Sequence, residues 1–114
     1  MTHSEQTQRV LALAHSDSIT VETDHRTLTG VIYRCNHHEP ELTLRGPEPG
    51  ARVLYFVTPT YDRYRLEYTY YDEYDHPQIT LDRYGRTPDS QYAWLRTHAT
   101  VDAITNPSEG GEQP

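Results

Sequence analysis

Residues Tyr61 to Tyr84 read Tyr-Asp-Arg-Tyr-Arg-Leu-Glu-Tyr-Thr-Tyr-Tyr-Asp-Glu-Tyr-Asp-His-Pro-Gln-Ile-Thr-Leu-Asp-Arg-Tyr. In the first part of this segment every second side chain is large and apolar or aromatic, a period of two that is typical of a strand with one buried face. The residues on that face are Tyr64, Leu66, Tyr68 and Tyr70. After an acidic turn that ends at Pro77, Ile79 and Leu81 alternate with polar residues. The pattern predicts a long β-hairpin whose aromatic face is turned inward.

Shorter alternating segments predict four further strands before the hairpin, at 18–23, 27–35, 42–45 and 52–57. Gly30 interrupts the second of these, which predicts a bulge or a close approach of two backbones. Both faces of the segment 52–57 are apolar, which is typical of a central strand. Segment 46–50, with two glycines and two prolines, predicts a turn. A short N-terminal helix is expected to run to about Ala14, with Ser4 as its cap.

The segment that follows Gly85 predicts a second helix. Thr87 suits the N-cap, Pro88 the first helical position and Asp89 the positive end of the helix dipole. This helix would end between Thr97 and Ala103. The predicted fold class is therefore α+β, a strongly curled antiparallel sheet or small barrel of five to six strands with a short helix at each end. Residues 1–105 are expected to form one domain, and 106–114 a disordered tail.

The composition is acidic and lacks lysine. Seventeen Asp and Glu residues face ten basic residues, all of them Arg, and the net charge is −7. Together with abundant Thr, this composition resembles that of haloarchaeal proteins, although a GC-rich genome favours Arg over Lys as well. The one cysteine excludes an intrachain disulfide and fits a reducing compartment. Neither a signal peptide nor a membrane-spanning apolar run is recognisable, so we expect a cytoplasmic protein.

The first half of the chain resembles the opening of an Sm-like domain. The resemblance consists of a short helix, the segment Ile-Thr-Val at 19–21, and Thr-Leu-Thr-Gly-Val-Ile-Tyr at 27–33. It implies a small curled barrel and, in that family, RNA binding. The Asp/Asn loop motif of the family should follow the second strand, but residues 35–39 read Cys-Asn-His-His-Glu. The second Sm motif is not recognisable either, so the resemblance implies a curled sheet and no particular binding residue.

The segment from Cys35 to Glu41 is the densest group of potential metal ligands. Cys35, His37 and His38 carry donor groups that bind zinc. A structural zinc site needs ligands from a second segment, and the spacing of the other histidines does not point to one. The alternative is a polar loop beside a half-buried cysteine. A Cys–His nucleophile pair is a third interpretation, but adjacency in sequence does not position a base. We expect no cofactor, and no catalytic signature is present.

The hairpin combines aromatic and cationic side chains that are common at protein interfaces. The predicted partner-binding residues are Arg63, Tyr64, Arg65, Tyr68, Tyr70, Tyr71, Arg83 and Tyr84. We expect a non-catalytic cytoplasmic interaction module that self-associates through this hairpin. One alternative is stacking of single-stranded RNA or DNA on Tyr and Arg, although the segment 61–86 holds six acids against four arginines. Others are plain core packing without a ligand and a metal site in the Cys/His loop.

Overall fold

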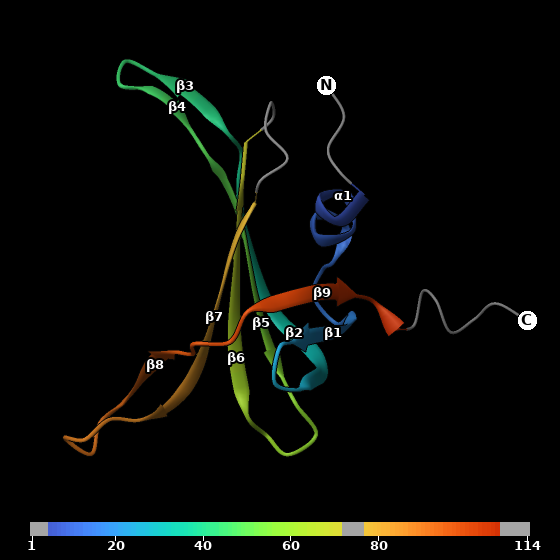
Figure 1. Cartoon of the computed structure of the whole chain (residues 1–114), viewed down its shortest axis with the longest axis vertical. Helices are drawn as coiled ribbons and strands as arrows, with labels where there is room; N and C mark the ends of the chain where they lie inside the picture. The colour runs from blue at the N-terminus through green and yellow to red at the C-terminus, as the bar shows by residue number, and fades with distance from the viewer. Residues whose placement is uncertain (1–4, 72–76, 108–114) are drawn as a thin grey trace, which may run out of the picture.

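The computed structural model describes residues 5–71 and 77–107 and shows a mostly β protein. Seven antiparallel strands form one sheet in the order β8-β7-β6-β5-β2-β1-β9, which curls into a half-barrel (Figure 1). The one helical element of these described ranges, α1, covers one face of it. The elements of this main body are α1 Glu5–Ala12, β1 Ser18–Thr23, β2 Thr27–His38, β5 Gly50–Val57, β6 Arg63–Tyr70, β7 Gln78–Arg86, β8 Tyr92–Arg96 and β9 Val101–Thr105.

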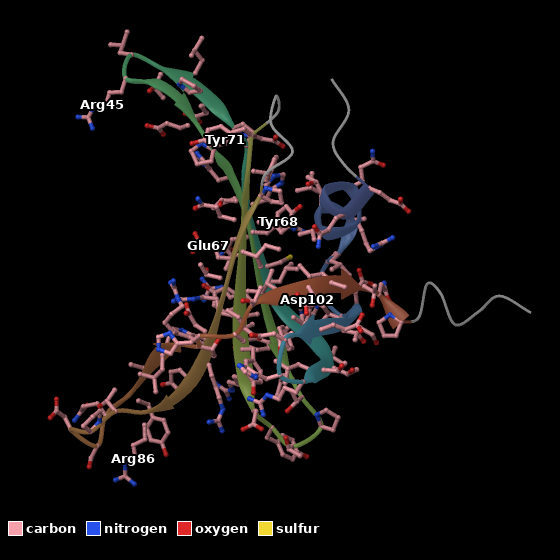
Figure 2. The ribbon with its side chains drawn as sticks, in the orientation of Figure 1. Arg45, Glu67, Tyr68, Tyr71, Arg86 and Asp102 are labelled. Carbon is pink, nitrogen blue, oxygen red and sulfur yellow. The ribbon has the colours of Figure 1, made fainter. Side chains whose placement is uncertain are left out.

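The predicted hairpin is confirmed and lies near the centre of the sheet. Strands β6 and β7 pair antiparallel, with Leu66 opposite Leu81 and Tyr68 opposite Ile79. The side chains predicted to turn inward are all buried. Their exposed fractions are Tyr64 2%, Leu66 0%, Tyr68 0% and Tyr70 2%. Figure 2 shows the alternation at two neighbouring positions, with Tyr68 on the side of α1 and Glu67 on the opposite side. The period of two therefore identified both the strand and its buried face.

Each buried tyrosine of β6 places its hydroxyl against a polar group from another element. The Tyr68 hydroxyl shares a 2.6 Å hydrogen bond with Oγ1 of Thr7 on α1. The Tyr70 hydroxyl lies 2.7 Å from Nε2 of His37 on β2. Burying a phenol without such a partner would cost free energy, so these bonds fix where α1 and β2 meet β6.

The curvature of the sheet depends on close contact between β2 and β5. A Cβ atom at Gly30 would lie 2.4 Å from the carbonyl oxygen of Val57 and 2.9 Å from a ring carbon of Phe56. The register between the two strands then shifts between Ile32 and Arg34, as at a β-bulge. The predicted close backbone approach at Gly30 is thus confirmed, and the irregularity itself lies a few residues further along.

A two-stranded arm replaces the third strand and the turn predicted between residues 42 and 50. Strands β3 (Glu41–Thr43) and β4 (Gly46–Glu48) pair with each other and project from the half-barrel (Figure 1). The expectation of a turn over 46–50 was wrong, because the chain reverses before β4. Leu42 and Leu44 are 85% and 108% exposed. The strand predicted at 42–45 is thus found in part, as β3, but among residues 5–71 and 77–107 it pairs only with β4.

The C-terminal helix is absent, and with it the α+β class and the count of five to six strands are overturned. Residues 87–91 form the turn of a β-hairpin, in which the Thr87 amide donates to the Gln91 carbonyl over 2.7 Å. Ser90 adopts a φ of 65°, in the left-handed region that closes such turns. Thr, Pro, Asp and Ser serve turns as well as helix starts. The residues that follow form strand β8. Tyr92 and Leu95, three positions apart, would lie on one face of a helix, but in a strand they lie on opposite faces.

Some predictions fall partly on residues that the structure does not describe. These are the Ser4 cap, most of the acidic turn before Pro77, and the tail beyond Pro107. In the described ranges, 5–71 and 77–107, no helix has both the length and the apolar character needed to cross a membrane.

Replacing Gly30 with Ala is expected to destabilise the protein by about 2 kcal/mol or more, because the added methyl group would overlap the Val57 backbone, which cannot move without separating β2 from β5. Urea unfolding followed by circular dichroism measures this change. Gly85→Ala is the matched control, since its Cβ would meet only the Leu95 side chain at 3.3 Å. Equal stabilities of the two variants would contradict the interpretation.

Candidate functional site

The face of the sheet opposite α1 carries a continuous group of aromatic and arginine side chains. We call it the aromatic–arginine face. The residues that alternate with the buried set on β5, β6, β7 and β8 contribute to it, together with the bulge of β2. Its members are Tyr33, Arg34, Tyr55, Arg63, Arg65, Asp82, Tyr84, Tyr92, Trp94 and Arg96. Strands distant in sequence thus contribute to one surface.

Five rings form a chain of neighbours across this face. The centroids of Tyr33 and Tyr55 are 6.2 Å apart, and those of Tyr55 and Trp94 are 5.6 Å apart. Trp94 then meets Tyr84 edge-on at 5.2 Å, and Tyr84 stacks on Tyr92 at 5.7 Å. Tyr92 is 64% exposed, and Tyr84 is 38% exposed. The chain therefore has half-buried rings, Tyr55 and Trp94, at its middle and exposed rings at both ends. Such tilted or offset contacts are favourable for aromatic pairs.

Three guanidinium groups lie over these rings. Arg34 lies 5.2 Å from the Tyr55 centroid, Arg63 lies 6.0 Å from Tyr33, and Arg65 lies 5.1 Å from Trp94. A cation over an aromatic face is attracted by the ring quadrupole, and a partly desolvated pair gains more than an exposed one. These contacts hold long arginine side chains flat against the sheet, which reduces the entropy that a partner would have to remove on binding.

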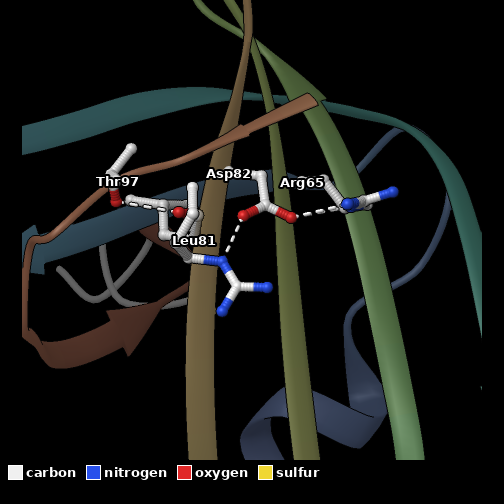
Figure 3. A network of polar contacts seen from close by, with 5 residues as sticks. Arg65, Leu81, Asp82 and Thr97 are labelled. Carbon is white, nitrogen blue, oxygen red and sulfur yellow. Dashed lines mark hydrogen bonds and ion pairs between the residues drawn. The ribbon is translucent and has the colours of Figure 1, made fainter. Parts of the chain in front are cut away.

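Asp82 is the buried anion of the face. Its side chain accepts hydrogen bonds from Arg65 on one oxygen, with Nη2 at 2.6 Å and Nε at 3.1 Å. Its other oxygen accepts from Nε of Arg96 at 2.6 Å (Figure 3). Asp82 is only 3% exposed, whereas the two arginines are partly open to solvent. Because its two partners come from β6 and β8, this carboxylate ties together three adjacent strands.

The pKa of Asp82 lies below its ordinary value of 3.8. Burial alone would raise it, but the hydrogen bonds from Arg65 and Arg96 and their positive charges outweigh that effect. The carboxylate is therefore ionised at neutral pH and stabilises the folded chain. Since the folded pKa is the lower one, this stabilisation is complete above about pH 4 and is lost as the pH falls through the folded value.

The structure divides the eight predicted partner-binding residues among the core, the aromatic–arginine face and other positions. Three of them, Tyr64, Tyr68 and Tyr70, belong to the core, so their rings are not available to a partner. Another set is on the aromatic–arginine face: Arg63, Arg65 and Tyr84. Arg83 is directed elsewhere and forms a 3.0 Å ion pair with Asp62. Tyr71 follows the end of β6 and is half-buried.

Most of the aromatic–arginine face was missed by reasoning from the hairpin alone. Tyr33 and Tyr55 could have been predicted to lie on this face, because each alternates with the buried residues of its own strand. Trp94, Tyr92 and Arg96 could not be placed, because their segment was predicted as a helix. Which of these side chains meet depends on the register between strands, which no local pattern in the sequence determines.

The candidate metal ligands are divided between the two faces of β2. Cys35 is half-buried against the core, and His37 on the same face bonds the Tyr70 hydroxyl. His38, the next residue along the strand, lies on the opposite face and is 3.9 Å from Glu41. Within residues 5–71 and 77–107, no three Cys, His, Asp or Glu side chains are grouped as a metal ion would need.

No protein-family model, curated protein or solved structure matches this chain. Its function must therefore be argued from its own surface.

Asp82→Asn is expected to lower the free energy of unfolding by about 2 kcal/mol at pH 7, because charge-assisted hydrogen bonds to two arginines are weakened. The difference from the parent protein should shrink as the pH falls below about 4, because Asp82 is then protonated in the unfolded chain and, at a lower pH, in the folded chain. Urea titrations at pH 7 and pH 3 measure both values. Asp102→Asn, at an exposed position on β9, is the control and should change neither. A loss that is the same at both pH values would show that charge is not its cause.

Proposed function

We propose that this protein is a small, non-catalytic cytoplasmic interaction module that self-associates through the aromatic–arginine face. The observation that supports this most directly is the five-ring chain with three arginines laid over it, on the side of the sheet that α1 leaves uncovered. Tyr, Trp and Arg are the residue types that contribute most binding energy at protein interfaces. The β6–β7 hairpin contributes to this association surface through its outward-facing residues only.

The composition of the face makes it complementary to itself. In a two-fold dimer the same patch contacts itself, so each copy must offer both members of every favourable pair. This face offers cations in Arg34 and Arg63 and exposed rings in Tyr84 and Tyr92. An arginine of one copy can therefore stack on a ring of the other. Asp82 neutralises much of the charge of Arg65 and Arg96, which reduces the repulsion between two copies.

The free edge of the sheet adjoins the same surface. Strand β8 is the last strand on its side, so the outer backbone groups of Tyr92–Arg96 have no neighbouring strand in the described chain. Unpaired edges favour association with another chain. A contact that begins on the rings of β8 can thus extend to its backbone.

Sedimentation velocity over a wide concentration range, in low and in molar salt, is expected to show a reversible dimer. Arg63→Glu should raise the dissociation constant about tenfold, because it places a carboxylate against rings and removes one cation–π pair. The charge-matched control is Arg45→Glu at the tip of the arm (Figure 2), which should leave the dissociation constant unchanged. A parent protein that stays monomeric at several hundred micromolar in both salts would rule the proposal out.

A second candidate function, binding of single-stranded nucleic acid, rests on the same rings. Successive rings 5.2 to 6.2 Å apart, with arginines beside them, are the elements of a stacking platform. The net charge of −7 opposes phosphate binding, which is why self-association is preferred.

Trp94 is the single tryptophan of the chain, so its fluorescence reports on this face directly. Addition of oligothymidylate at low salt should leave its emission unchanged if the face serves self-association alone. Saturable quenching that weakens with salt, and that Tyr92→Ala reduces severalfold, would instead establish the nucleic-acid function. Tyr61→Ala, an exposed tyrosine outside the face, is the control for loss of an aromatic ring.

A further inference from the structure

A pocket of about 320 Å3 opens on the inner side of the half-barrel, away from the aromatic–arginine face. It lies between the turn that joins β1 to β2 and the connector that joins β8 to β9. Its floor is apolar and consists of Leu28, the ring of Tyr64 and Leu81, each of which is at most 8% exposed. A volume of this size is in the lower range of small-molecule sites.

Backbone and side-chain hydrogen bonds hold the walls of this pocket in place. The amide of Asp24 donates to the carbonyl of Thr100 over 3.0 Å, and the amide of Thr100 donates to Oδ1 of Asp24 over 2.9 Å. Further along the connector, the amide and the hydroxyl of Thr97 both donate to the carbonyl of Leu81, at 2.9 and 2.8 Å. The opening is therefore built before any ligand arrives, which lowers the free-energy cost of binding.

The opening is lined by three basic side chains beside two threonines, Thr23 and Thr97. Arg26, His25 and His98 line the pocket, and no Asp or Glu does, although the chain as a whole has a net charge of −7. Two carboxylates lie nearby without lining the pocket. Asp24 accepts the Thr100 amide and lies 3.5 Å from His25, and Asp62, in an adjoining hollow, is bound by Arg83.

Arg26 links the apolar floor to the charged rim. Its Nη2 donates to the Tyr64 hydroxyl over 3.1 Å, which holds the guanidinium at the hydroxyl end of the buried ring. A guanidinium has five N–H donors, and this is the one hydrogen bond that its side chain makes within the part of the chain described here. The remaining donors can form the bidentate contact that a carboxylate prefers.

We propose that this pocket binds a small organic anion, a carboxylate with a compact apolar body of about the size of one ring. The body would lie on Leu28, Tyr64 and Leu81, and the carboxylate would bond to Arg26 with His25 and His98 beside it. The site is independent of the self-association proposed above, because it uses the other side of the sheet.

The test is a titration of the parent protein, followed by amide chemical shifts, with three ligands of similar shape: benzoate, benzyl alcohol and benzylamine. Benzoate is expected to bind with a dissociation constant on the order of 1 mM, as befits so small a ligand. Shifts should concentrate at residues 23–28 and 97–100. Benzyl alcohol should bind at least tenfold more weakly, and benzylamine should not bind. Equal binding of benzoate and benzyl alcohol, or no saturable shifts with benzoate, would overturn the proposal.

Arg26→Gln and Ala99→Leu test separately whether benzoate binding needs the arginine charge and whether it needs the open cavity. Arg26→Gln removes the proposed carboxylate partner and should weaken benzoate binding about tenfold, whereas Arg86→Gln, an equal charge change at the far end of the β7–β8 hairpin, should leave it unchanged. Ala99→Leu keeps all three basic residues but fills part of the pocket, and should also abolish saturable binding. If Arg86→Gln weakens binding as much as Arg26→Gln, benzoate responds only to overall charge and the site is refuted. Retained binding in Ala99→Leu would refute it as well.

Discussion

The fold depends on the need to satisfy three buried phenol groups on one strand. Tyr64, Tyr68 and Tyr70 all point inward from β6, and each hydroxyl meets a polar atom from a different part of the chain. The partners belong to the β1–β2 turn, to α1 and to β2. A phenylalanine in the same positions would bury a similar ring but would have no preferred polar neighbour, whereas a phenol specifies one. In a chain of which only 34% of residues are hydrophobic, this specificity compensates for a modest core.

The same strand divides the molecule into two functional sides. Its inward residues connect the core, and its outward residues, Arg63 and Arg65, hold the rings of other strands by cation–π contact. Asp82 then anchors Arg65 and Arg96 from below. The outer surface is therefore ordered by ion pairs and rings rather than by a second layer of helices, which leaves it accessible. The inner side retains an opening where the half-barrel does not close.

The local alternation of residues was sufficient to predict a strand where one of its faces is buried. It was insufficient in the other segments. The alternation from Tyr64 to Tyr70 identified β6 and its orientation, and Gly30 correctly indicated a close backbone approach. The segment from Thr87 to Leu95 was misread because its turn residues also begin helices, and only pairing with β7 decides between the two. The aromatic–arginine face could not be predicted from the sequence for a related reason. Tyr55 and Trp94 lie far apart in the chain, and their rings meet only because the sheet curls.

The projecting arm of β3 and β4 is paired only with itself and presents its leucines to solvent. The residues that maintain the core lie outside it, so its length and composition are released from the packing constraints that govern the rest of the chain. Substitutions, insertions and deletions in this arm should accumulate during evolution without unfolding the half-barrel. For the same reason it is a natural position for grafting a foreign peptide, where the two ends of the insert would be presented side by side on a rigid base.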